Sequence, residues 1–489
     1  MANLIRRFTI VALLLALGAD AQSCSRSMSP SYPAPVVAEG YAAQLIISGL
    51  TKPRSILFDT KGALLVVESG VGITHITLQD DGNTCIGMGN TTTLVDNKEL
   101  NHGIDLSQDG KTLYASTESE VFSWTYDPVA ATASNPRTLI NGMSTSGHST
   151  RTLLLSKKQP DILLVSQGSA ANIDPQATDM RTGISQIRSF NLTELKGKRI
   201  YNYTDGTVLG WGLRNSVGVA EEPITGGIFS VENSADQVTR KGVDIHENNP
   251  GEEMNFHGFL NGTMTIQSAN HGYPGCLAVW GTDIPDVGNM TVGWQFSHDA
   301  SSDVNDDLCM LMFTPPRLTF QAHTAPLDIK FNPNGTLAYV SFHGSWNRDD
   351  PAGYMLSVIA FANGEPTEPR TSITAAVPIL SNQDPSACPG NCFRPVGLAF
   401  DSQERLFMTS DSTGEIYVVV RTSADGSGVP SNNGGSSDQG GGNNGGGGGI
   451  GNENAATTGA VVPRSYESLL LVGVTLTLSL VGGAFFAVG

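Results

Sequence analysis

One sequence phrase recurs six times along the chain: a short polar loop, an apolar run, a turn and a second apolar run. The copies begin at Leu50, Leu100, Gly147, Leu213, Thr324 and Phe393. Repeated strand–turn–strand units indicate an array, and six copies closed into a circle predict a β-propeller. In such a ring, equivalent positions of every copy point toward one central channel. Polar residues that are far apart in the sequence can therefore meet in one site.

The apolar runs of the copies have the alternation of half-buried strands. When the copies are aligned, the first run shares an apolar column at Ile56, Ile104, Leu153, Val219, Ile329 and Leu398. Apolar residues that alternate with small or polar ones are typical of strands with one buried face. Tight hairpin turns are predicted at Lys61-Gly62, Asp109-Gly110 and Asn334-Gly335. Because no convincing helical period precedes the C-terminal segment, the sequence predicts an all-β, six-bladed β-propeller over residues 22–421.

The two ends of the chain have the composition of processing signals. Residues 1–21 combine a basic start with a short apolar stretch, which predicts a secretory signal peptide. Residues 466–489 are largely apolar and no Lys or Arg follows the apolar run, which predicts a glycolipid (GPI) anchor signal with Asn454 as an attachment site. An ordinary tail anchor is the alternative. Between them, residues 422–465 form a predicted flexible linker and spacer rich in Gly, Ser and Asn.

The cysteines and glycosylation sequons fit a secreted chain. An even count of six cysteines predicts three disulfides. The simplest pairs are Cys388 with Cys392, Cys276 with Cys309, and Cys24 with Cys85, although the sequence leaves other pairings open. No two cysteines have the CxxC spacing of a zinc site. Six N-glycosylation sequons begin at Asn90, Asn191, Asn202, Asn261, Asn289 and Asn334.

Basic residues gather at one equivalent place in the repeats, just before the first apolar run. These positions hold Lys52, Arg54, His102, His148, Arg151, Arg214, Asn215, His323 and Arg394. The chain as a whole has a formal net charge of −18, which disfavours nucleic acid as a partner. Each of these residues also has a structural alternative: Arg54 could pair with Glu68, and His102 could cap a turn.

The residue types at these positions indicate a kind of chemistry. Guanidinium groups bind carboxylates and phosphates with paired hydrogen bonds, and histidine exchanges protons near neutral pH. The pattern therefore predicts an anionic cofactor or substrate together with a general base. Residue spacing alone does not identify the ligand.

Longer stretches carry a resemblance to a known family. They are GHSTRTLLLS (147–156), GWGLRNSVGVA (210–220), VENSADQ (231–237), NPGEEMNF (249–256), YVSFHGSWNR (339–348) and FRPVGLAFDSQERLFMTSDSTGEIYVV (393–419). These stretches resemble fungal pyrroloquinoline-quinone (PQQ)-dependent pyranose dehydrogenases, bacterial sorbosone dehydrogenases and, more distantly, soluble quinoprotein glucose dehydrogenase. Those families are six-bladed propellers, which agrees with the independent count of six repeats.

The resemblance implies roles for three residues at the strand starts. His148 of GHSTR is expected to remove the hydroxyl proton of the sugar while a hydride passes to the quinone. Arg214 of GLRN is expected to polarise the quinone oxygen and stabilise the charge that develops there. Asn215 is expected to donate a hydrogen bond to the cofactor.

The same resemblance implies a wider cofactor site. Arg54, Arg394 and Arg348 are candidates for holding the cofactor carboxylates. His343 and Trp346, in the HGSWNR loop, are expected to cover the quinone ring or shape the sugar pocket. A position in the protein core is the alternative for Trp346.

Calcium is the second cofactor that the resemblance implies, and it is expected to bind mainly through backbone carbonyls. The matching segment supplies Glu232, Asn233, Ser234 and Asp236, whose oxygen atoms suit a hard cation. Other polar residues nearby have simpler interpretations. Glu252-Glu253 could be a solvated pair, and His246, His257 and His271 could be surface residues.

The sequence therefore predicts a secreted or cell-surface PQQ-dependent oxidoreductase that is a monomer. The resemblance implies pyranoses or 2-keto-sugars of the glucosone, sorbosone and fucose class as substrates. The chain has no CxxCH haem motif, so a separate electron acceptor is expected, either a diffusible quinone or a secreted haem protein. The alternatives are a non-catalytic carbohydrate-binding or adhesion propeller, and a calcium-dependent lactonase-type hydrolase, which would require several carboxylates at the channel.

Overall fold

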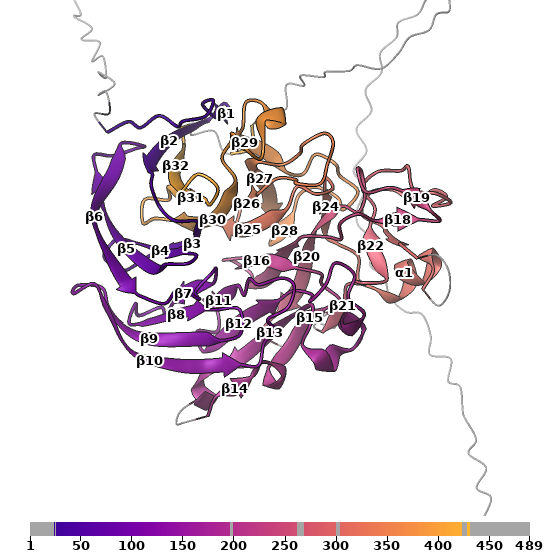
Figure 1. Cartoon of the computed structure of the whole chain (residues 1–489), viewed down its shortest axis with the longest axis horizontal. Coiled ribbons are helices and arrows are strands. Elements are labelled where there is room, and N and C mark those ends of the chain that lie inside the picture. Colours follow the sequence, from indigo (N-terminus) through magenta and orange to yellow (C-terminus); the bar gives the residue numbers. More distant parts are fainter. Residues whose placement is uncertain are drawn as a thin grey trace, which may run out of the picture. The chain divides into compact units, whose positions relative to one another are not determined.

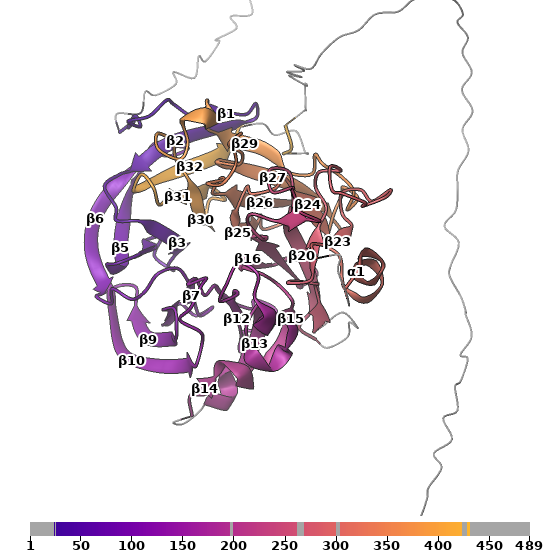
Figure 2. The same cartoon turned by 45° about the vertical axis from the view of Figure 1, so that its right-hand side comes forward.

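Six antiparallel sheets follow one another along the chain and surround a common centre (Figure 1). In each sheet the first strand lies nearest the centre and the later strands lie further out, as a second view also shows (Figure 2). The inner strands contact each other in a closed circle, in the order β3, β7, β11, β16, β25, β30 and back to β3. This arrangement confirms the predicted all-β, six-bladed propeller.

The first three sheets follow the predicted repeats. Sheet 1 consists of β3 (Pro53–Phe58), β4 (Leu64–Glu68), β5 (Gly72–Asp80) and β6 (Ile86–Val95). Sheet 2 consists of β7 (Ile104–Leu106), β8 (Thr112–Ser116), β9 (Val121–Asp127) and β10 (Thr132–Asn141), with β14 (Tyr201–Asn202) added in parallel at its edge. Sheet 3 consists of β11 (Leu153–Leu155), β12 (Ile162–Gln167), β13 (Gln186–Asn191) and β15 (Thr207–Trp211), with β21 (Ala269–Asn270) at its edge.

The last three sheets include the strands that close the ring. Sheet 4 consists of β16 (Ser216–Glu221), β17 (Gly227–Glu232), β20 (Glu252–Phe259) and β24 (Leu318–Phe320). Sheet 5 consists of β25 (Pro326–Phe331), β26 (Leu337–Phe342), β27 (Met355–Ala362) and β29 (Val377–Ser381), extended by β1 (Val36–Val37) and β28 (Glu365–Pro366). Sheet 6 consists of β30 (Pro395–Phe400), β31 (Leu406–Ser410), β32 (Glu415–Arg421) and β2 (Tyr41–Ile47).

The ring is closed by a strand from the beginning of the chain. β2 pairs antiparallel with β32, with Tyr41 opposite Arg421 and Leu45 opposite Tyr417. The outermost strand of sheet 6 therefore precedes sheet 1 in the sequence. This pairing ties the two ends of the propeller together.

The structure describes residues 24, 26–195, 199–261, 268–299, 304–422 and 428–430. The predicted signal peptide, the C-terminal segment and nearly all of the linker lie outside these residues. Within the described ranges, no helix combines the length and apolar character needed to span a bilayer.

The predicted hairpin turns lie between the first and second strands of their sheets. Gly62, Gly110 and Gly335 occupy these turns with φ values of 80°, 69° and 67°, a left-handed conformation that glycine adopts readily. The apolar face of each sheet packs on its neighbours. Between sheets 6 and 1, for example, the rings of Phe58 and Phe407 meet edge to face with their centres 4.7 Å apart.

Hydroxyl groups at the ends of second strands join neighbouring sheets near the channel. Ser116 on β8 donates to the carbonyl of Arg151 at 2.6 Å, and Thr409 on β31 donates to the carbonyl of Arg54 at 2.8 Å. These buried bonds fix the start of each inner strand relative to the preceding sheet.

The expectation that no helix precedes the C-terminal segment is wrong in one place. Helix α1 (Asp306–Met312) lies in the long insertion between β20 and β24, and the Asn305 side chain accepts from the Leu308 amide at 2.9 Å as its N-cap. At seven residues α1 is too short to show a helical period in the sequence. Among the residues that the structure describes, five 3₁₀ turns also occur: η1 (Pro175–Thr178), η2 (Met180–Thr182), η3 (Leu192–Leu195), η4 (Tyr203–Asp205) and η5 (Pro385–Ala387). The same insertion carries β22 (Cys276–Ala278) and β23 (Gln295–Ser297), and β18 (Thr239–Arg240) pairs with β19 (Val243–Asp244).

All three of the simplest cysteine pairings are present. The disulfides join Cys24 to Cys85, Cys276 to Cys309 and Cys388 to Cys392. Five of the six sequon asparagines are exposed and Asn191 is half-buried. These positions fit the expected sequon sites, whose modification stays a prediction.

Candidate active site

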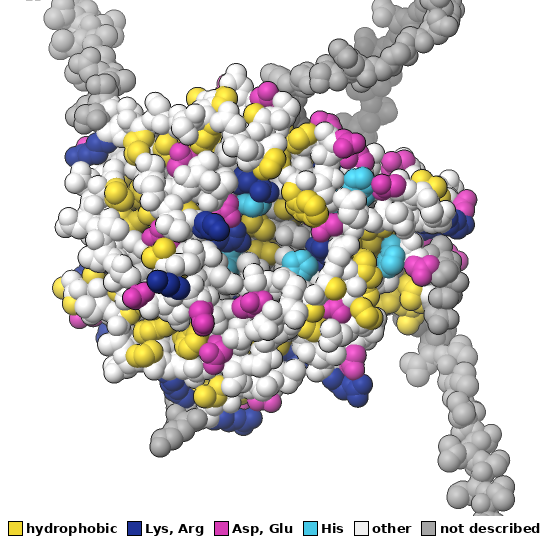
Figure 3. Space-filling view, viewed as in Figure 1, with side chains coloured by type: hydrophobic (Ala, Val, Ile, Leu, Met, Phe, Trp, Pro, Cys, Tyr) yellow, Lys and Arg dark blue, Asp and Glu magenta, His cyan; other side chains and the backbone are white. Residues whose placement is uncertain are grey.

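The mouth of the central channel collects basic side chains. Figure 3 shows Lys, Arg and His side chains around a hollow at the centre of one face, over the region of β16, β25 and β30 in Figure 1. Two of the predicted residues do not contribute an accessible group. Arg151 is fully buried and its Nη1 donates to the carbonyls of His148 and Thr150 at 2.7 Å. His102 is also buried, and burial holds its pKa well below the usual value, so it is neutral.

His148 and Arg214 come together through Ser169. The Ser169 amide donates to the Arg214 carbonyl at 2.8 Å, and the Ser169 carbonyl accepts from the His148 amide at 3.0 Å. A single residue, Ser169, thus bridges the backbones of two residues that are 66 positions apart in the sequence. The backbones of His148 and Arg214 therefore lie on the same side of the ring.

The His148 imidazole is held in one tautomer. Its Nδ1 lies 2.9 Å from the Ser169 carbonyl oxygen. Because a carbonyl oxygen only accepts hydrogen bonds, Nδ1 carries the proton and Nε2 keeps a free lone pair. Burial, and then the charge of Arg214, lower the His148 pKa to about 4. At neutral pH, Nε2 is therefore available to accept a proton.

The Arg214 guanidinium is fixed by four hydrogen bonds. Nη2 donates to an Asp236 carboxylate oxygen at 2.8 Å and to the Asn172 side-chain oxygen at 2.9 Å. Nε donates to the Asn172 carbonyl at 3.1 Å, and Nη1 donates to the Asn233 carbonyl at 3.2 Å. One of the five N–H groups, on Nη1, has no partner within the described part of the chain. A rigid cation with one available donor suits the stabilisation of a developing negative charge.

Asn215 and His148 both pack against Gly168, whose lack of a side chain leaves room for them. A Cβ atom on Gly168 would lie 2.5 Å from Asn215 Oδ1 and 2.8 Å from His148 Cβ. Only a residue without a side chain allows this approach. Asn215 itself is buried, and its side-chain Nδ2 donates to Asn233 Oδ1 at 3.5 Å.

Three residues from different sheets form an ionic chain on another part of the mouth. Arg54 Nη1 donates to one oxygen of Asp411 at 2.6 Å, and His343 Nε2 lies 2.8 Å from the other. Burial raises the Asp411 pKa, but the bond from His343 and the charge of Arg54 outweigh burial and lower it below the usual range. Arg54 therefore pairs with Asp411 rather than with Glu68, the alternative that the sequence offered. Glu68 accepts instead from the Thr51 amide at 2.6 Å.

Arg394 presents the second guanidinium of this region. Its Nε and Nη2 donate to the carbonyls of His343 and Gly344 at 3.0 and 2.9 Å. Nη1 of Arg394, and Nε and Nη2 of Arg54, have no protein partner among the residues described. These donors would suit a ligand that carries carboxylates.

The HGSWNR loop forms part of the rim. Trp346 is 68 % exposed, which excludes the core position offered as its alternative. Its neighbour Asn347 donates to Asp236 at 3.2 Å. Arg348 bonds the Glu247 carbonyl and pairs with the Glu247 carboxylate at 3.1 Å. Arg348 therefore anchors the loop to residue 247, and its role in the cofactor site stays a prediction.

The side chains of the predicted calcium segment are already bonded within the protein. Glu232 accepts from the Arg214 amide and from Asn255 Nδ2, the latter at 3.2 Å. Asp236 is paired with Arg214. Within the described ranges no three His, Cys, Asp or Glu residues form a group suited to a metal ion. The carboxylates of this segment therefore do not form a metal cage, and the calcium assignment stays a prediction based on backbone carbonyls.

The other two members of that segment are tied to the neighbouring strand starts. Asn233 Nδ2 donates to the Pro326 carbonyl at 2.7 Å. The Ser234 amide donates to Glu252 at 2.6 Å, and the other Glu252 oxygen accepts from the Ala325 amide at 3.2 Å. Glu252 thus links the segment that holds Arg214 to the start of sheet 5.

Glu252 and Glu253 are not the solvated pair that the sequence allowed. They are 2 % and 5 % exposed. Burial raises the pKa of Glu252 to about 8 and that of Glu253 to about 7. Burial, and then the proximity of Glu253, also raise the pKa of Glu232 well above its usual value. Through these hydrogen bonds, Glu252 fixes the backbone at Ser234 and Glu232 fixes the backbone at Arg214.

Two of the histidines expected at the surface, His257 on β20 and His271 in the long insertion, are also more buried than expected. His257 and His271 are 0 % and 2 % exposed, and their rings meet with centres 5.0 Å apart. His257 Nε2 lies 2.7 Å from the Ser230 hydroxyl. His246 is half-buried, and its carbonyl lies 2.5 Å from Nε2 of His323. The contact with the His246 carbonyl fixes the His323 side chain.

Several residues of the site were not found from the sequence. Asp411, Ser169, Gly168 and Asn172 were not singled out, although each contacts a residue that was. Asp411 lies within the resembling stretch 393–419, so it could have been considered. The others act mainly through backbone atoms or through the absence of a side chain, for which a single sequence carries no signal.

Comparison with known proteins identifies the family to which this chain belongs. A sequence model of the TrAA12-like family matches residues 35–422, which include all six sheets. The chain belongs to the TrAA12-like family. This finding confirms the resemblance seen in the repeats and the GHSTR, GLRN and HGSWNR stretches.

Two relatives are informative. The chain is 49 % identical over 436 residues to a pyrroloquinoline quinone-dependent sugar dehydrogenase of Hypocrea jecorina (strain QM6a), covering 88 % of this chain and 100 % of that protein. It is 39 % identical over 419 residues to a pyrroloquinoline quinone-dependent pyranose dehydrogenase of Coprinopsis cinerea, covering 82 % of this chain. The match spans only 56 % of the Coprinopsis protein.

Solved structures agree with this placement. The fold matches a calcium structure of the Trichoderma reesei carbohydrate-active enzyme family AA12 at 50 % identity and a TM-score of 0.80, covering 81 % of this chain and all of that one. It matches the holo form of the pyranose dehydrogenase PQQ domain from Coprinopsis cinerea at 37 % identity and a TM-score of 0.76, covering 81 % and 99 %. A soluble aldose sugar dehydrogenase from Escherichia coli, at 14 % identity, shares the fold.

Proposed function

We propose that this TrAA12-like protein is a PQQ-dependent sugar dehydrogenase. One observation supports the proposal above all. The channel mouth holds His148, which is neutral and has a free Nε2, together with Arg54 and Arg394, which have donors without a protein partner among the described residues. The names of two relatives at 49 % and 39 % identity support the same cofactor and reaction class.

The donor set at the mouth fits an anionic cofactor. PQQ carries carboxylates, and the available nitrogens of Arg54 and Arg394 would bind them by charge-assisted hydrogen bonds. Asn215 and the remaining N–H of Arg214 would supply further hydrogen bonds. The charge on Asp411 would repel a carboxylate. Arg54 neutralises this charge, and Asp411 also accepts a hydrogen bond from His343.

The protein's own groups would handle the proton and the charge. Bound PQQ would supply the quinone that accepts the hydride of the sugar. His148 Nε2 would take the hydroxyl proton, and its Nδ1 bond to Ser169 would keep the imidazole oriented. Arg214 would stabilise negative charge without reorganising, because four hydrogen bonds already hold it.

We infer that the substrates are pyranoses or 2-keto-sugars of the glucosone, sorbosone and fucose class. The exposed indole of Trp346 at the rim offers an apolar surface for a sugar ring. The name of the Coprinopsis relative supports pyranoses in particular. The electron acceptor is proposed to be a separate molecule.

The decisive experiment is a titration of purified apo protein. The protein is mixed with calcium and PQQ, and binding is followed by quenching of tryptophan fluorescence. A sugar panel is then added, and the absorbance change of PQQ reduction is recorded. Arg54→Ala is expected to weaken PQQ binding. Failure of the wild-type protein to bind PQQ would reject the proposal in favour of a carbohydrate-binding or adhesion propeller.

We also propose that the enzyme works outside the cell, attached by a glycolipid anchor. The support is the sequence of residues 1–21 and 466–489 together with three disulfides, which form in oxidising compartments. Phosphatidylinositol-specific phospholipase C should release activity from intact cells. Activity that stays with the cells after complete cleavage of a known anchored protein would reject the anchor.

A further inference from the structure

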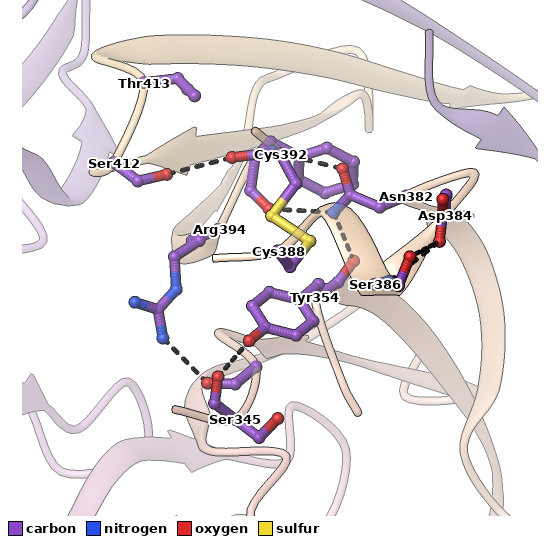
Figure 4. The surroundings of a disulfide bond; sticks show 12 residues. Ser345, Tyr354, Asn382, Asp384, Ser386, Cys388, Cys392, Arg394, Ser412 and Thr413 are labelled. Atoms are coloured by element: carbon purple, nitrogen blue, oxygen red, sulfur yellow. Dashed lines mark hydrogen bonds between the residues drawn. A yellow bond between two sulfur atoms is a disulfide. The ribbon is translucent and has the colours of Figure 1, made fainter. Parts of the chain in front are cut away.

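A buried cluster of Tyr354, Cys388 and Cys392 lies behind the Arg394 side chain (Figure 4). The three residues are 1 %, 7 % and 3 % exposed. The Tyr354 ring packs on the disulfide, and its hydroxyl donates to the Ser345 carbonyl. The Arg394 guanidinium carbon lies 5.6 Å from the centre of the same ring, within cation–π range. The ring therefore connects the disulfide to the guanidinium.

The backbone just before Arg394 is fixed to the same cluster. Asn382 Nδ2 donates to the carbonyls of Tyr354 and Phe393, both at 3.0 Å. Its Oδ1 accepts from the Phe393 amide at 3.3 Å. Because Cys392 precedes Phe393 directly, the disulfide and Asn382 together hold the chain on its approach to Arg394.

The direction of the guanidinium is set by the same contacts. Nε and Nη2 are occupied by the carbonyls of His343 and Gly344, which leaves Nη1 without a protein partner among the described residues. Gly344 lies so close to Tyr354 that a Cβ atom there would come within 2.2 Å of the ring. Tyr354 therefore fixes both the guanidinium face and the carbonyl that holds it.

We propose that the Cys388–Cys392 disulfide, acting through Tyr354, positions Arg394 for the carboxylates of the cofactor. The inference rests on the proposed function, because it assigns Arg394 a PQQ-binding role. An arginine that is already ordered loses little side-chain freedom on binding. Without the disulfide this ordering would occur on binding, and PQQ affinity should fall about three- to tenfold.

The test compares two disulfide deletions. Cys388→Ala/Cys392→Ala removes the proposed support, and Cys24→Ala/Cys85→Ala removes a disulfide of sheet 1 as the matched control. The accessibility of Arg394 is measured without PQQ, as its rate of modification by phenylglyoxal in peptide mass spectrometry. Arg181, whose side chain is 88 % exposed, is the internal reference.

The second readout is the PQQ dissociation constant of each apo protein, with Arg394 intact or changed by Arg394→Ala. We expect faster modification of Arg394 and three- to tenfold weaker PQQ binding in the Cys388→Ala/Cys392→Ala variant only. In the Arg394→Ala background, removing the disulfide should cause no further loss. A general loss of stability would not produce this dependence on Arg394.

The outcomes separate the inference from the proposed function. An unchanged modification rate of Arg394 overturns the positioning role, whatever the PQQ result. Faster modification of Arg394 in the disulfide variant, together with PQQ binding that is unchanged in both the disulfide and the Arg394→Ala variants, overturns the cofactor role of Arg394. If the double cysteine variant does not fold, Tyr354→Leu removes the connection and must give the same two changes for the proposal to stand.

Discussion

At the scale of single residues, the state of His148 determines the expected pH dependence. Its pKa is lowered to about 4, so the neutral base is fully present at pH 7 and is lost only as the pH falls toward 4. We expect kcat/KM for the sugar to be constant from pH 8 to about pH 5 and to fall below that range. The measurement is a pH profile of sugar oxidation with PQQ-saturated enzyme.

Replacing the base tests the same assignment. His148→Gln should bind PQQ but lose about 10²–10⁴ in kcat, since general-base catalysis contributes that much. His246→Gln, whose imidazole bonds Asp244 outside the channel mouth, is the control and should keep its activity. A His148→Gln enzyme with normal turnover would remove this residue from the mechanism.

Gly168 gives a second prediction at this scale. In Gly168→Ala, the new methyl group would overlap Asn215 Oδ1 and His148 Cβ at 2.5 and 2.8 Å, so both must move. A displacement of about 1 Å in a catalytic group can cost about 10² in rate, and we expect a loss of that order in kcat/KM. Gly390→Ala, where nothing lies within 4 Å, should have no effect. Equal kinetics for the two variants would contradict the proposed geometry.

The candidate site could be predicted in part from single residues. His148, Arg214, Asn215, Arg54 and Arg394 all reach the channel mouth, because strand starts in a closed ring converge. The sequence could not reveal their partners. Asp411 binds Arg54 from 357 positions away, and only the closed fold makes that pair visible. The exposed fraction of a residue such as Glu252 likewise depends on what the long insertion covers.

At the scale of elements, the hydroxyl bridges between sheets should carry measurable stability. Thr409 on β31 donates to the Arg54 carbonyl on β3 at 2.8 Å and accepts from the Gly397 amide at 2.7 Å. Thr409→Val keeps the shape but leaves two buried backbone groups unpaired, which should lower the free energy of unfolding by about 1–3 kcal/mol. Thr409→Ser keeps the hydroxyl and should be milder. Urea denaturation of the three proteins measures the difference, and equal values for Val and Ser would refute the bridge.

Two buried histidines, His257 on β20 and His271 in the insertion that follows it, should make the fold sensitive to acid. Burial lowers the pKa of His271 to about 4, and burial and then His271 lower that of His257. Their pKa values are depressed in the folded state, so stability is present above about pH 6.5 and is lost as the pH falls toward 4. His271 should cost about 2 kcal/mol of unfolding free energy at pH 5.

The measurement is the change in unfolding free energy between pH 7.5 and pH 5. His271→Leu should reduce that change by about 2 kcal/mol, because the variant has one fewer group to protonate on unfolding. An identical pH dependence for the wild-type and His271→Leu proteins would show that His271 is not the acid-sensitive group.

The strands were predictable because their pattern is local, whereas the insertion was not. Alternating apolar residues and turn glycines mark the strands of each repeat, and these occur where expected. The described part of residues 260–317 contains strands of two or three residues and the seven-residue helix α1. Elements that short show no periodicity. Their placement depends on tertiary contacts and on the Cys276–Cys309 disulfide.

At the scale of the whole molecule, the six repeats predicted the ring but not how it closes. The last repeat supplies only β30, β31 and β32, and β2 from the start of the chain completes sheet 6. Leu45, Ile46 and Ile47 of this strand are at most 3 % exposed. Removing β2 should therefore expose the edge of β32 and separate sheets 6 and 1, between which Arg54 meets Asp411.

Two truncated chains test the closure directly, both carrying Cys85→Ser to remove the thiol left by the loss of Cys24. A chain that begins at residue 41 keeps β2 and should unfold in one cooperative transition and bind PQQ. A chain that begins at residue 48 lacks only β2 by comparison. Because Arg54 and Asp411 would no longer be held together, we expect it to lose PQQ binding, and to lose cooperative unfolding as measured by circular dichroism. Equal cooperativity and affinity in the two chains would mean that the ring, and the site built on it, do not depend on this strand.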